Sequence, residues 1–362
     1  MFRSLIPLVL IAAACAGPEP TVPGQDRTPV APSPANAPDP ITVMTQNLYP
    51  GANLDLVIGA LASADPSDDV PSLQTAIATL EATDFRVRAN AIADAIAAAR
   101  PHAVGLQEVA SIDLALDLGT PIILSVHFLP VLQAALDQRG LNYRVAAQEE
   151  NFAVAPLPGI SFADSDVLLV DADRVSVTTG SGHAFSNNLG VVAPGVDLER
   201  GWVGARVTID GHPYYIASTH PESGHQPGLA ELRAAQISEL IGSLPGDVPT
   251  ILLGDLNDEP GSPMYQVLGQ AGFTDAWRAL RPGASGDTCC HADDLSDPVA
   301  HFTQRIDYVF TRGLGTSKGR LIGDVKRVGA QPSDRIAGPE FAIWPSDHAG
   351  LIATVRSPAG VP

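Results

Sequence analysis

The run from Ile251 to Asp258 ends a hydrophobic segment with two side chains that can do chemistry. Its sequence, ILLGDLND, places Asp255 and Asn257 directly after three apolar residues and a glycine, with one residue between them. Such an apolar run favours a buried strand, and side chains two residues apart on a strand point to the same face. The pair therefore predicts a carboxylate that handles a metal ion or an attacking water, beside an amide that holds a phosphate oxygen.

Five other segments carry polar groups at predicted strand ends or strand–loop junctions. Taken alone, each has an ordinary explanation: Asp307 could pair with Arg305, for example, and His220 could be a satisfied loop histidine. The recurrence of complementary groups at successive strand ends instead favours a single active site. The segments are Thr45-Gln46-Asn47, Gln107-Glu108, Ser218-Thr219-His220, Arg305-Ile306-Asp307-Tyr308 and Ser346-Asp347-His348.

The elements that would position these groups follow one another along residues 41–355. Helical spacing of apolar residues predicts two helices between Leu73 and Ile96 and a third over Leu229–Leu240. Strands interleaved with few helices indicate a mixed-sheet α/β sandwich without an internal domain boundary. The predicted strands are Ile41–Leu48, Ala103–Leu106, Tyr143–Gln148, Asp166–Val170, Trp202–Ile209, Tyr214–Ser218, Thr250–Leu253, Ile306–Phe310 and Gly350–Val355.

The order of these motifs resembles the endonuclease/exonuclease/phosphatase superfamily, which has the deoxyribonuclease I-like fold. Gly254-Asp255-Leu256-Asn257 and Ser346-Asp347-His348 are its most specific marks, and the resemblance covers Ile41 to Val355. It implies an α/β (α+β) fold, a four-layered sandwich of two mixed β-sheets flanked by helices, with the active site at one end. We therefore expect one catalytic domain over residues 41–358.

The resemblance also implies hydrolysis of phosphoric esters and a role for each site residue. Glu108 would be the main ligand of Mg²⁺, with Mn²⁺ or Ca²⁺ as alternatives. Asp307 would fix the tautomer of the second histidine, and either that histidine or Asp255 would take the proton of the attacking water. Arg200 would contact the substrate phosphate or, as an alternative, form a surface salt bridge. The implied catalytic residues are His348, Asp255, His220 and Asp307, the substrate-binding residues Asn257, Asn47 and Arg200, and the metal-proximal residues Glu108, Asn47, Asp347 and Asp166.

Charge and composition limit the kind of substrate. Lys and Arg total 21 against 40 Asp and Glu, a formal net charge of −19, and 45% of the residues are hydrophobic. So acidic a chain argues against a broad basic surface for polyanions, although a bound cation can reverse the field locally. The tryptophans Trp202, Trp277 and Trp344 are isolated, so the sequence gives no sign of an aromatic hairpin for membrane insertion.

Several phosphoesters therefore stay open as substrates: nucleic acid, a small organic phosphate and a phospholipid headgroup. We expect a phosphodiesterase or nuclease first, with a phosphatase of small metabolites or a sphingomyelinase-like phospholipase as alternatives. A phosphatase would use the segments Gly51–Val70 and Gly283–Ala300, which we expect to be loops, to select its substrate. A non-catalytic surface binding lipoprotein is the alternative from another class. We expect a monomer.

The N-terminus has the features of an export signal. Met1-Phe2-Arg3 supplies a positive charge, and Leu5 to Ala14 is apolar but too short to span a bilayer as a helix. Ala12-Ala13-Ala14-Cys15 resembles a bacterial lipobox, which predicts a signal peptide over residues 1–15 and a lipid on Cys15; ordinary secretion is the alternative. Residues 16–40 are rich in proline and predict an extended tether. We therefore expect an exported protein, either a cell-envelope lipoprotein that meets the membrane only through its lipid or a secreted one.

Two further cysteines, Cys289 and Cys290, are adjacent in the sequence. Neighbouring cysteines can form a vicinal disulfide, bind a metal or stay free, and two thiols alone make a poor zinc site. We expect a loop feature whose redox state the sequence leaves open.

Overall fold

Two large β-sheets contain most of the strands of this protein. The computed structural model describes residues 39–63, 65, 67–117, 121–155, 158–193, 196–315 and 320–356, all within the compact unit of residues 37–362. The predicted signal peptide, Cys15 and nearly all of the predicted tether lie outside the described residues.

The first sheet is built around the parallel pair β1 (Ile41–Asn47) and β2 (Ala103–Gln107). Its strand order is β15-β18-β1-β2-β6-β3-β4, and β5 also pairs with β6. All its other pairings are antiparallel, so the sheet is mixed. The remaining strands are β3 (Ser111–Asp117), β4 (Pro121–His127), β5 (Tyr143–Val154), β6 (Ile160–Asp171), β15 (Gly323–Val328) and β18 (Gly350–Val355).

The second sheet has the same kind of centre, the parallel pair β11 (His212–Thr219) and β12 (Thr250–Asp255). Its strand order is β13-β14-β12-β11-β10-β7. The other four strands are β7 (Val175–Ala184), β10 (Gly201–Ile209), β13 (Thr274–Asp275) and β14 (Asp307–Arg312). Two small ribbons complete the strands: β8 (Gly190–Ala193) with β9 (Val196–Leu198), and β16 (Ile336–Ala337) with β17 (Ala342–Ile343).

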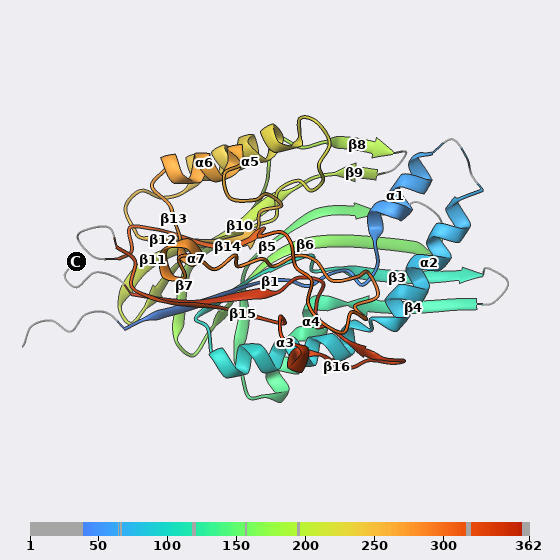
Figure 1. The fold of residues 1–362 in the computed structure, drawn as a ribbon, viewed down its shortest axis with the longest axis horizontal. Coiled ribbons are helices and arrows are strands. Elements are labelled where there is room, and N and C mark those ends of the chain that lie inside the picture. The colour runs from blue at the N-terminus through green and yellow to red at the C-terminus, as the bar shows by residue number, and fades with distance from the viewer. Residues whose placement is uncertain are drawn as a thin grey trace, which may run out of the picture. The chain divides into compact units, whose positions relative to one another are not determined.

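Helices cover the outer face of each sheet (Figure 1). On the first sheet these are α2 (Asp69–Ala82), α3 (Phe85–Ala99) and α4 (Phe128–Gln138), whose apolar residues share a core with β1, β2 and β6. On the second sheet α5 (Leu229–Ser243) and α6 (Pro263–Gln270) pack against β10, β12 and β14. The other helices over the described residues are α1 (Leu54–Ala62), α7 (Ala276–Leu280) and the 3₁₀ turn Pro332–Asp334.

The period-2 alternation of the strands explains why the sheets stack. Val43 faces a core between the two sheets, whereas its neighbour Met44 faces the helices of the first layer. In the second sheet Leu253 faces the central core and Leu252 faces α5 and α6. Central strands such as β1 and β12 are therefore buried on both faces, and the predicted four-layered sandwich of two mixed β-sheets flanked by helices is confirmed.

The structure has a strand over each predicted strand range and helices where helical spacing predicted them. It also contains elements that the sequence did not predict, among them α1, α4, β3, β4 and β7. The expectation that Gly51–Val70 is a loop was wrong, because Asn53 caps α1 by accepting a hydrogen bond from the Leu56 backbone. Among the described residues, no helix is long and apolar enough to cross a membrane.

Candidate active site

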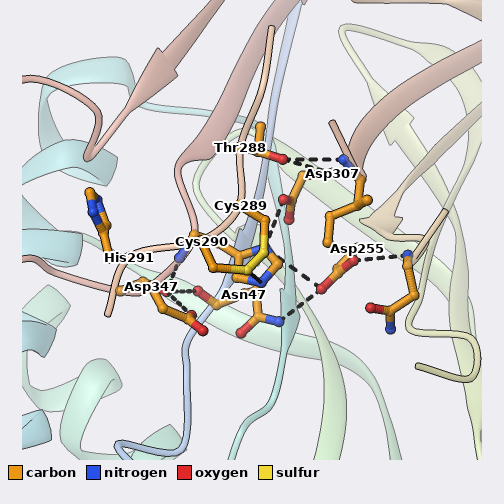
Figure 2. Close-up of a disulfide and its surroundings, with 12 residues drawn as sticks. Asn47, Asp255, Thr288, Cys289, Cys290, His291, Asp307 and Asp347 are labelled. Carbon is orange, nitrogen blue, oxygen red and sulfur yellow. Dashed lines mark hydrogen bonds and ion pairs between the residues drawn. A yellow bond between two sulfur atoms is a disulfide. The ribbon is translucent and has the colours of Figure 1, made fainter. Parts of the chain in front are cut away.

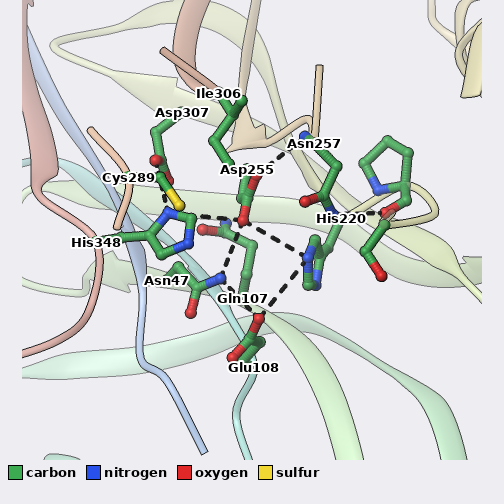
Figure 3. A network of polar contacts seen from close by, with 12 residues as sticks. Asn47, Gln107, Glu108, His220, Asp255, Asn257, Cys289, Ile306, Asp307 and His348 are labelled. Carbon is green, nitrogen blue, oxygen red and sulfur yellow. Dashed lines mark hydrogen bonds and ion pairs between the residues drawn. The ribbon is translucent and has the colours of Figure 1, made fainter. Parts of the chain in front are cut away.

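The predicted chemical groups meet where the parallel strand pairs end (Figure 3). Asn47 is the last residue of β1 and Glu108 follows β2; Asp255 is the last residue of β12 and His220 follows β11. Asp307 begins β14, which is antiparallel to β12, and lies opposite Asp255 in register. The edges of the two stacked sheets therefore deliver five functional groups to one place.

The backbone at these strand ends adopts conformations that non-glycine residues rarely use. Glu108 and Asn257 have φ values of 56° and 52°, in the left-handed region. Gly254, directly before Asp255, has φ 153°, and a Cβ there would collide with the Thr219 carbonyl of the neighbouring strand. Backbone strain of this kind gathers at functional sites, where surrounding contacts hold it. The glycine of the Gly-Asp-x-Asn motif therefore serves the close approach of β11 and β12.

Asn47 connects the two sheets at the centre of the site. Its Nδ2 donates to Glu108 Oε1 at 2.9 Å and to Asp255 Oδ2 at 3.0 Å. Its Oδ1 accepts the backbone N–H of Tyr49 at 2.9 Å, which fixes the amide orientation. A donor between two carboxylates lowers their mutual repulsion, so Asn47 orients both acids. Its predicted part in phosphate or metal binding stays a prediction.

Asp307 holds His348 through the Nδ1 atom. The Nδ1–Asp307 Oδ2 distance is 2.8 Å, and Asp255 Oδ2 lies 3.7 Å from the same nitrogen. Burial alone would lower the pKa of His348, but the carboxylates of Asp307, Asp347 and Asp255 raise it well above its ordinary value. These carboxylates therefore favour the protonated form of the imidazole. The alternative that Asp307 pairs with Arg305 does not hold, because Arg305 donates to Asp275 at 2.6 Å.

His220 has the opposite environment. A guanidinium N–H of Arg200 lies 3.1 Å from Nδ1, and since guanidinium can only donate, Nδ1 is the acceptor. The proton of the neutral ring is therefore on Nε2, which lies 3.6 Å from Asp255 Oδ2 and 3.9 Å from Glu108 Oε1. Burial, and then the positive charges of Arg200 and His348, lower the pKa of His220 well below its ordinary value. The pKa values of two histidines at one site are thus shifted in opposite directions.

Arg200 is buried rather than part of a surface salt bridge. Its Nε lies 3.6 Å from Glu222 Oε1, and the carboxylates of Glu222, Asp164 and Asp166 raise its pKa even though burial opposes the rise.

Asp164 lines the cleft, but Asp166, predicted to lie near the metal, is fully buried and is not part of the cleft lining. Burial, and then Asp164, raise the pKa of Asp166 far above its usual range. Asp166 therefore lies behind the cleft wall, where the His220 backbone and the charge of Arg200 favour its ionised form.

Asn257 and Asp347 complete the predicted set, and both line the cleft. The backbone N–H of Asn257 donates to Asp255 Oδ1 at 3.0 Å, and its Nδ2 donates to the Pro221 carbonyl at 3.0 Å. Asn257 thereby ties the loop that follows His220 to the loop that follows Asp255. Its amide has one further N–H for a phosphate oxygen.

Oxygen ligands suited to a hard divalent cation gather around Glu108. Burial, and then the charge of Asp347, raise the pKa of Glu108 to about 8. Burial likewise raises the pKa of Asp347. Each of these carboxylates makes it harder for the other to ionise. A bound cation would remove this repulsion, because its positive charge stabilises both ionised groups. A carboxylate oxygen of Glu108 also lies within 4.8 Å of ligand atoms of both His220 and Asp255. The group of Glu108, His220 and Asp255 therefore has a donor set that fits a divalent metal ion.

These groups line a cleft of about 350 Å³. Among its described lining residues, Arg200 is the one lysine or arginine, whereas six are acidic: Glu108, Asp164, Glu222, Asp255, Asp293 and Asp347. Burial raises the pKa of Asp255 to about 6, with His348 opposing the rise and Asp307 adding to it. The cleft is thus an acidic hollow with one fixed guanidinium.

The adjacent cysteines lie in the same cleft, joined in a disulfide (Figure 2). Cys290 Sγ is 3.8 Å from His348 Nε2. The preceding Thr288 accepts the Asp307 backbone N–H at 3.2 Å through its hydroxyl. The Cys289-Cys290 segment therefore supports the strand that begins with Asp307 and forms a wall beside His348.

Sequence reasoning missed several residues that shape the site. Glu222, which pairs with Arg200, is separated from His220 by one proline. An acid so close to a predicted catalytic histidine could have indicated that Glu222 belongs to the site. Tyr49, which anchors the Asn47 amide, and Thr288 gave no such signal, because their contribution depends on backbone contacts between distant segments.

Comparisons with known proteins agree with this geometry. Residues 77–348 match the model of the Endonuclease/Exonuclease/phosphatase family. No curated protein matches the chain significantly in sequence. A family protein from Beutenbergia cavernae is similar in structure with a TM-score of 0.57 and 19% identity, covering 90% of this chain and 74% of that one. A family protein from Leptotrichia buccalis gives 0.55 and 13% identity, covering 87% and 99%.

A mannosyl-6-phosphatase from Bacteroides thetaiotaomicron is similar with a TM-score of 0.51 and 15% identity, covering 87% of this chain and 99% of that one. At such identities the likeness shows the fold alone. The family match spans the strand ends that carry Glu108, Asp255 and His348, so sequence and architecture lead to the same assignment. The chain belongs to the endonuclease/exonuclease/phosphatase family of phosphoester hydrolases.

Proposed function

We propose that this protein is a divalent-metal-dependent phosphodiesterase that hydrolyses one P–O bond of an organic phosphodiester. The observation that carries the proposal is the group of Glu108 and Asp255, bridged by Asn47 and flanked by two histidines of opposite pKa shift. Hydrolysis needs a base for water, neutralisation of charge on phosphoryl oxygens and a donor near the leaving oxygen. The cleft has a candidate for each.

Asp255 is the favoured general base. With a pKa of about 6 it is ionised at neutral pH, whereas the raised pKa of His348 leaves that imidazole protonated. His348 therefore acts as a donor, its Nε2–H facing the cleft and a phosphoryl oxygen. His220 presents Nε2–H from the opposite side, close to the leaving oxygen, because Arg200 occupies its Nδ1. A cation held by Glu108 and Asp347 would neutralise charge on the phosphoryl oxygens.

Charge favours a diester over the other phosphoesters. A phosphodiester carries one negative charge and a monoester close to two, so those carboxylates of the cleft that remain ionised repel a monoester more strongly. A polynucleotide adds a negative charge with every further phosphate, and the cleft offers only Arg200 as a fixed cation among its described lining residues. These charges support a substrate with a single phosphodiester group ahead of nucleic acid.

Hydrolysis of bis-p-nitrophenyl phosphate tests the proposal. We expect turnover with Mg²⁺, Mn²⁺ or Ca²⁺, loss of turnover with a chelator and recovery when metal is returned. Glu108→Gln should lower kcat/KM by about 10²-fold or more, since it removes the main carboxylate at the proposed metal site. Glu231→Gln on α5, an exposed residue outside the cleft, is the matched control and should retain full activity.

Three further substrates separate the alternatives. Faster hydrolysis of p-nitrophenyl phosphate would point to a phosphatase, and rapid cleavage of DNA or RNA to a nuclease. No hydrolysis of any of these substrates with all three cations would overturn the enzymatic proposal and support a binding lipoprotein.

We also propose that the protein is exported and carries a lipid on Cys15. The positive Met1-Phe2-Arg3, the apolar run Leu5 to Ala14 and the proline-rich residues 16–40 support this placement. A tether followed by a folded body suits an enzyme that works away from the membrane surface.

A further inference from the structure

A second cavity, of about 80 Å³, borders the catalytic cleft. Leu54, Phe152 and Phe162 line both cavities. The second cavity, called here the apolar pocket, lies between α1 and α2 on one side and β3, β5 and β6 on the other. All of its lining residues except Ser161 are apolar. It is therefore a compartment without charge that adjoins an acidic hollow.

Strand β6 leads from one compartment to the other. Asp164 lines the cleft, Phe162 lines both cavities and Ile160 lines the apolar pocket. These three residues occupy every second position of the strand and so point to the same face. At about 3.3 Å per residue, the distance along the strand from Asp164 to Ile160 is roughly 13 Å. One strand face therefore changes from charged to apolar with distance from the catalytic groups.

An aromatic pair forms the boundary between the compartments. The rings of Phe152 and Phe162 stack with centroids 5.6 Å apart. Phosphate, sugar or charged groups would lose their hydration beyond this pair without gaining a partner, which is costly, whereas hydrocarbon would gain. The segment that closes the pocket contains Leu54 and Ala76, and part of it is the region predicted to select the substrate.

We propose that the apolar pocket takes the hydrocarbon group of an amphipathic phosphodiester whose phosphate lies in the catalytic cleft. The inference rests on the proposed phosphodiesterase function and adds the substrate class to it. The substrate would place its single phosphate beside Arg200 and Asp255 and extend an alkyl group past Phe162 towards Ile160. A protein that binds its substrate in this way selects substrates by the length of their hydrocarbon group and accepts changes in the other parts of the substrate.

A series of p-nitrophenyl alkyl phosphates tests this directly with the unaltered protein. Methyl, ethyl, propyl, butyl and hexyl esters share one leaving group and one charge, so differences between them report the alkyl site. We expect kcat/KM to rise by about fourfold per methylene, the ratio that ~0.8 kcal/mol per buried methylene gives, and then to level off when the pocket is full. A flat or falling series with a methyl ester that is still hydrolysed would overturn the inference and leave the phosphodiesterase proposal standing. Failure to hydrolyse any ester would overturn both.

Filling the pocket gives the second test. Ala76 is a buried lining residue on α2, whereas Ala78 on the same helix is exposed, so Ala76→Phe and Ala78→Phe form a matched pair. Ala76→Phe should abolish the rise with chain length, with a loss of at least tenfold on the hexyl ester, and leave the methyl ester within about twofold of the unaltered protein. Ala78→Phe should keep the full series.

Thermal unfolding of both variants shows whether the fold survives. If Ala76→Phe unfolds, Val57→Phe fills the same pocket from α1 and should give the same loss. A folded pocket-filling variant that retains the full dependence on chain length would place the hydrocarbon elsewhere and overturn the inference.

Discussion

The contact between Asp307 and His348 makes a sharp prediction for the variant Asp307→Asn. Asp307 is fully buried, and its Oδ2 lies 2.8 Å from His348 Nδ1. Asparagine keeps the volume but removes the charge that holds His348 as a cation. Burial then dominates, so the pKa of His348 falls and the ring becomes neutral at neutral pH. The variant should lose the proposed donor to the phosphoryl oxygen without losing the fold.

The size of the loss follows from the proposed role of His348. A positioned proton donor or acceptor contributes about 10²–10⁴-fold to the rate. Because asparagine retains one acceptor oxygen that still orients the ring, we expect the lower part of that range, a fall of about 10²–10³-fold in kcat. The alkaline limb of the pH–rate profile should also move to lower pH, since it reports loss of the His348 proton.

Stability should show the same shift with the same sign. A histidine whose pKa is raised in the folded protein stabilises the fold fully below its unfolded pKa, about 6.5, and this contribution is lost as pH rises through the folded value. Asp307→Asn removes that contribution, so the variant should lose stability mainly below the wild-type folded pKa. Urea unfolding at several pH values, together with pH–rate profiles, measures both effects.

Asp113→Asn is the matched control for this experiment. Asp113 also contacts a histidine, His127, at 3.2 Å, but both side chains are about half exposed and neither lines the cleft. Exposed pairs contribute little, so activity and its pH profile should not change. An Asp307→Asn variant with an unmoved alkaline limb and near-normal kcat would refute the assignment of His348 as the protonated donor.

Three other predictions test separate parts of the site and the chain. Asn47→Ala removes the donor between Glu108 and Asp255, so their repulsion should lower kcat/KM at least tenfold, and the unpaired Tyr49 N–H should cost about 1–3 kcal/mol in urea unfolding. Arg200→Gln leaves Glu222 without its cation and should destabilise the fold by about 3 kcal/mol; an unchanged unfolding midpoint would contradict the buried ion pair. Cys15→Ala should abolish incorporation of labelled fatty acid in a bacterial host, whereas Cys290→Ser should retain it.

Much of the site could be predicted from the sequence because the ends of buried strands can be recognised in it. Asp255 follows three apolar residues and a glycine, and Glu108 follows the run Ala103–Leu106. Burial of such strands on both faces makes their apolar runs continuous, and the first polar group after each run lies at the sheet edge. The structure indeed brings Asn47, Glu108, Asp255 and His220 to one edge.

Other features were hidden because pattern alone does not determine them. The residues of β7 are largely exposed, so that strand shows little hydrophobic alternation and gives no strand signal. Helix α1 lies in a segment that lacks a long apolar period, and its start depends on the Asn53 cap. The sequence also gives no measure of depth: Asp164 lines the cleft, whereas Asp166, two residues further along β6, is fully buried behind it, and its predicted place near a metal stays a prediction.

The two histidines show why the sequence left the general base undecided. His220 and His348 have the same intrinsic chemistry, and each follows the pattern of a polar group at a strand end. What separates them is the neighbour of Nδ1: a carboxylate, Asp307, for one ring and a guanidinium, Arg200, for the other. The first neighbour favours the protonated form of His348, which is why we propose the acid next to it, Asp255, with a pKa raised only to about 6, as the base. The division of roles is thus set by residues that meet only in the fold.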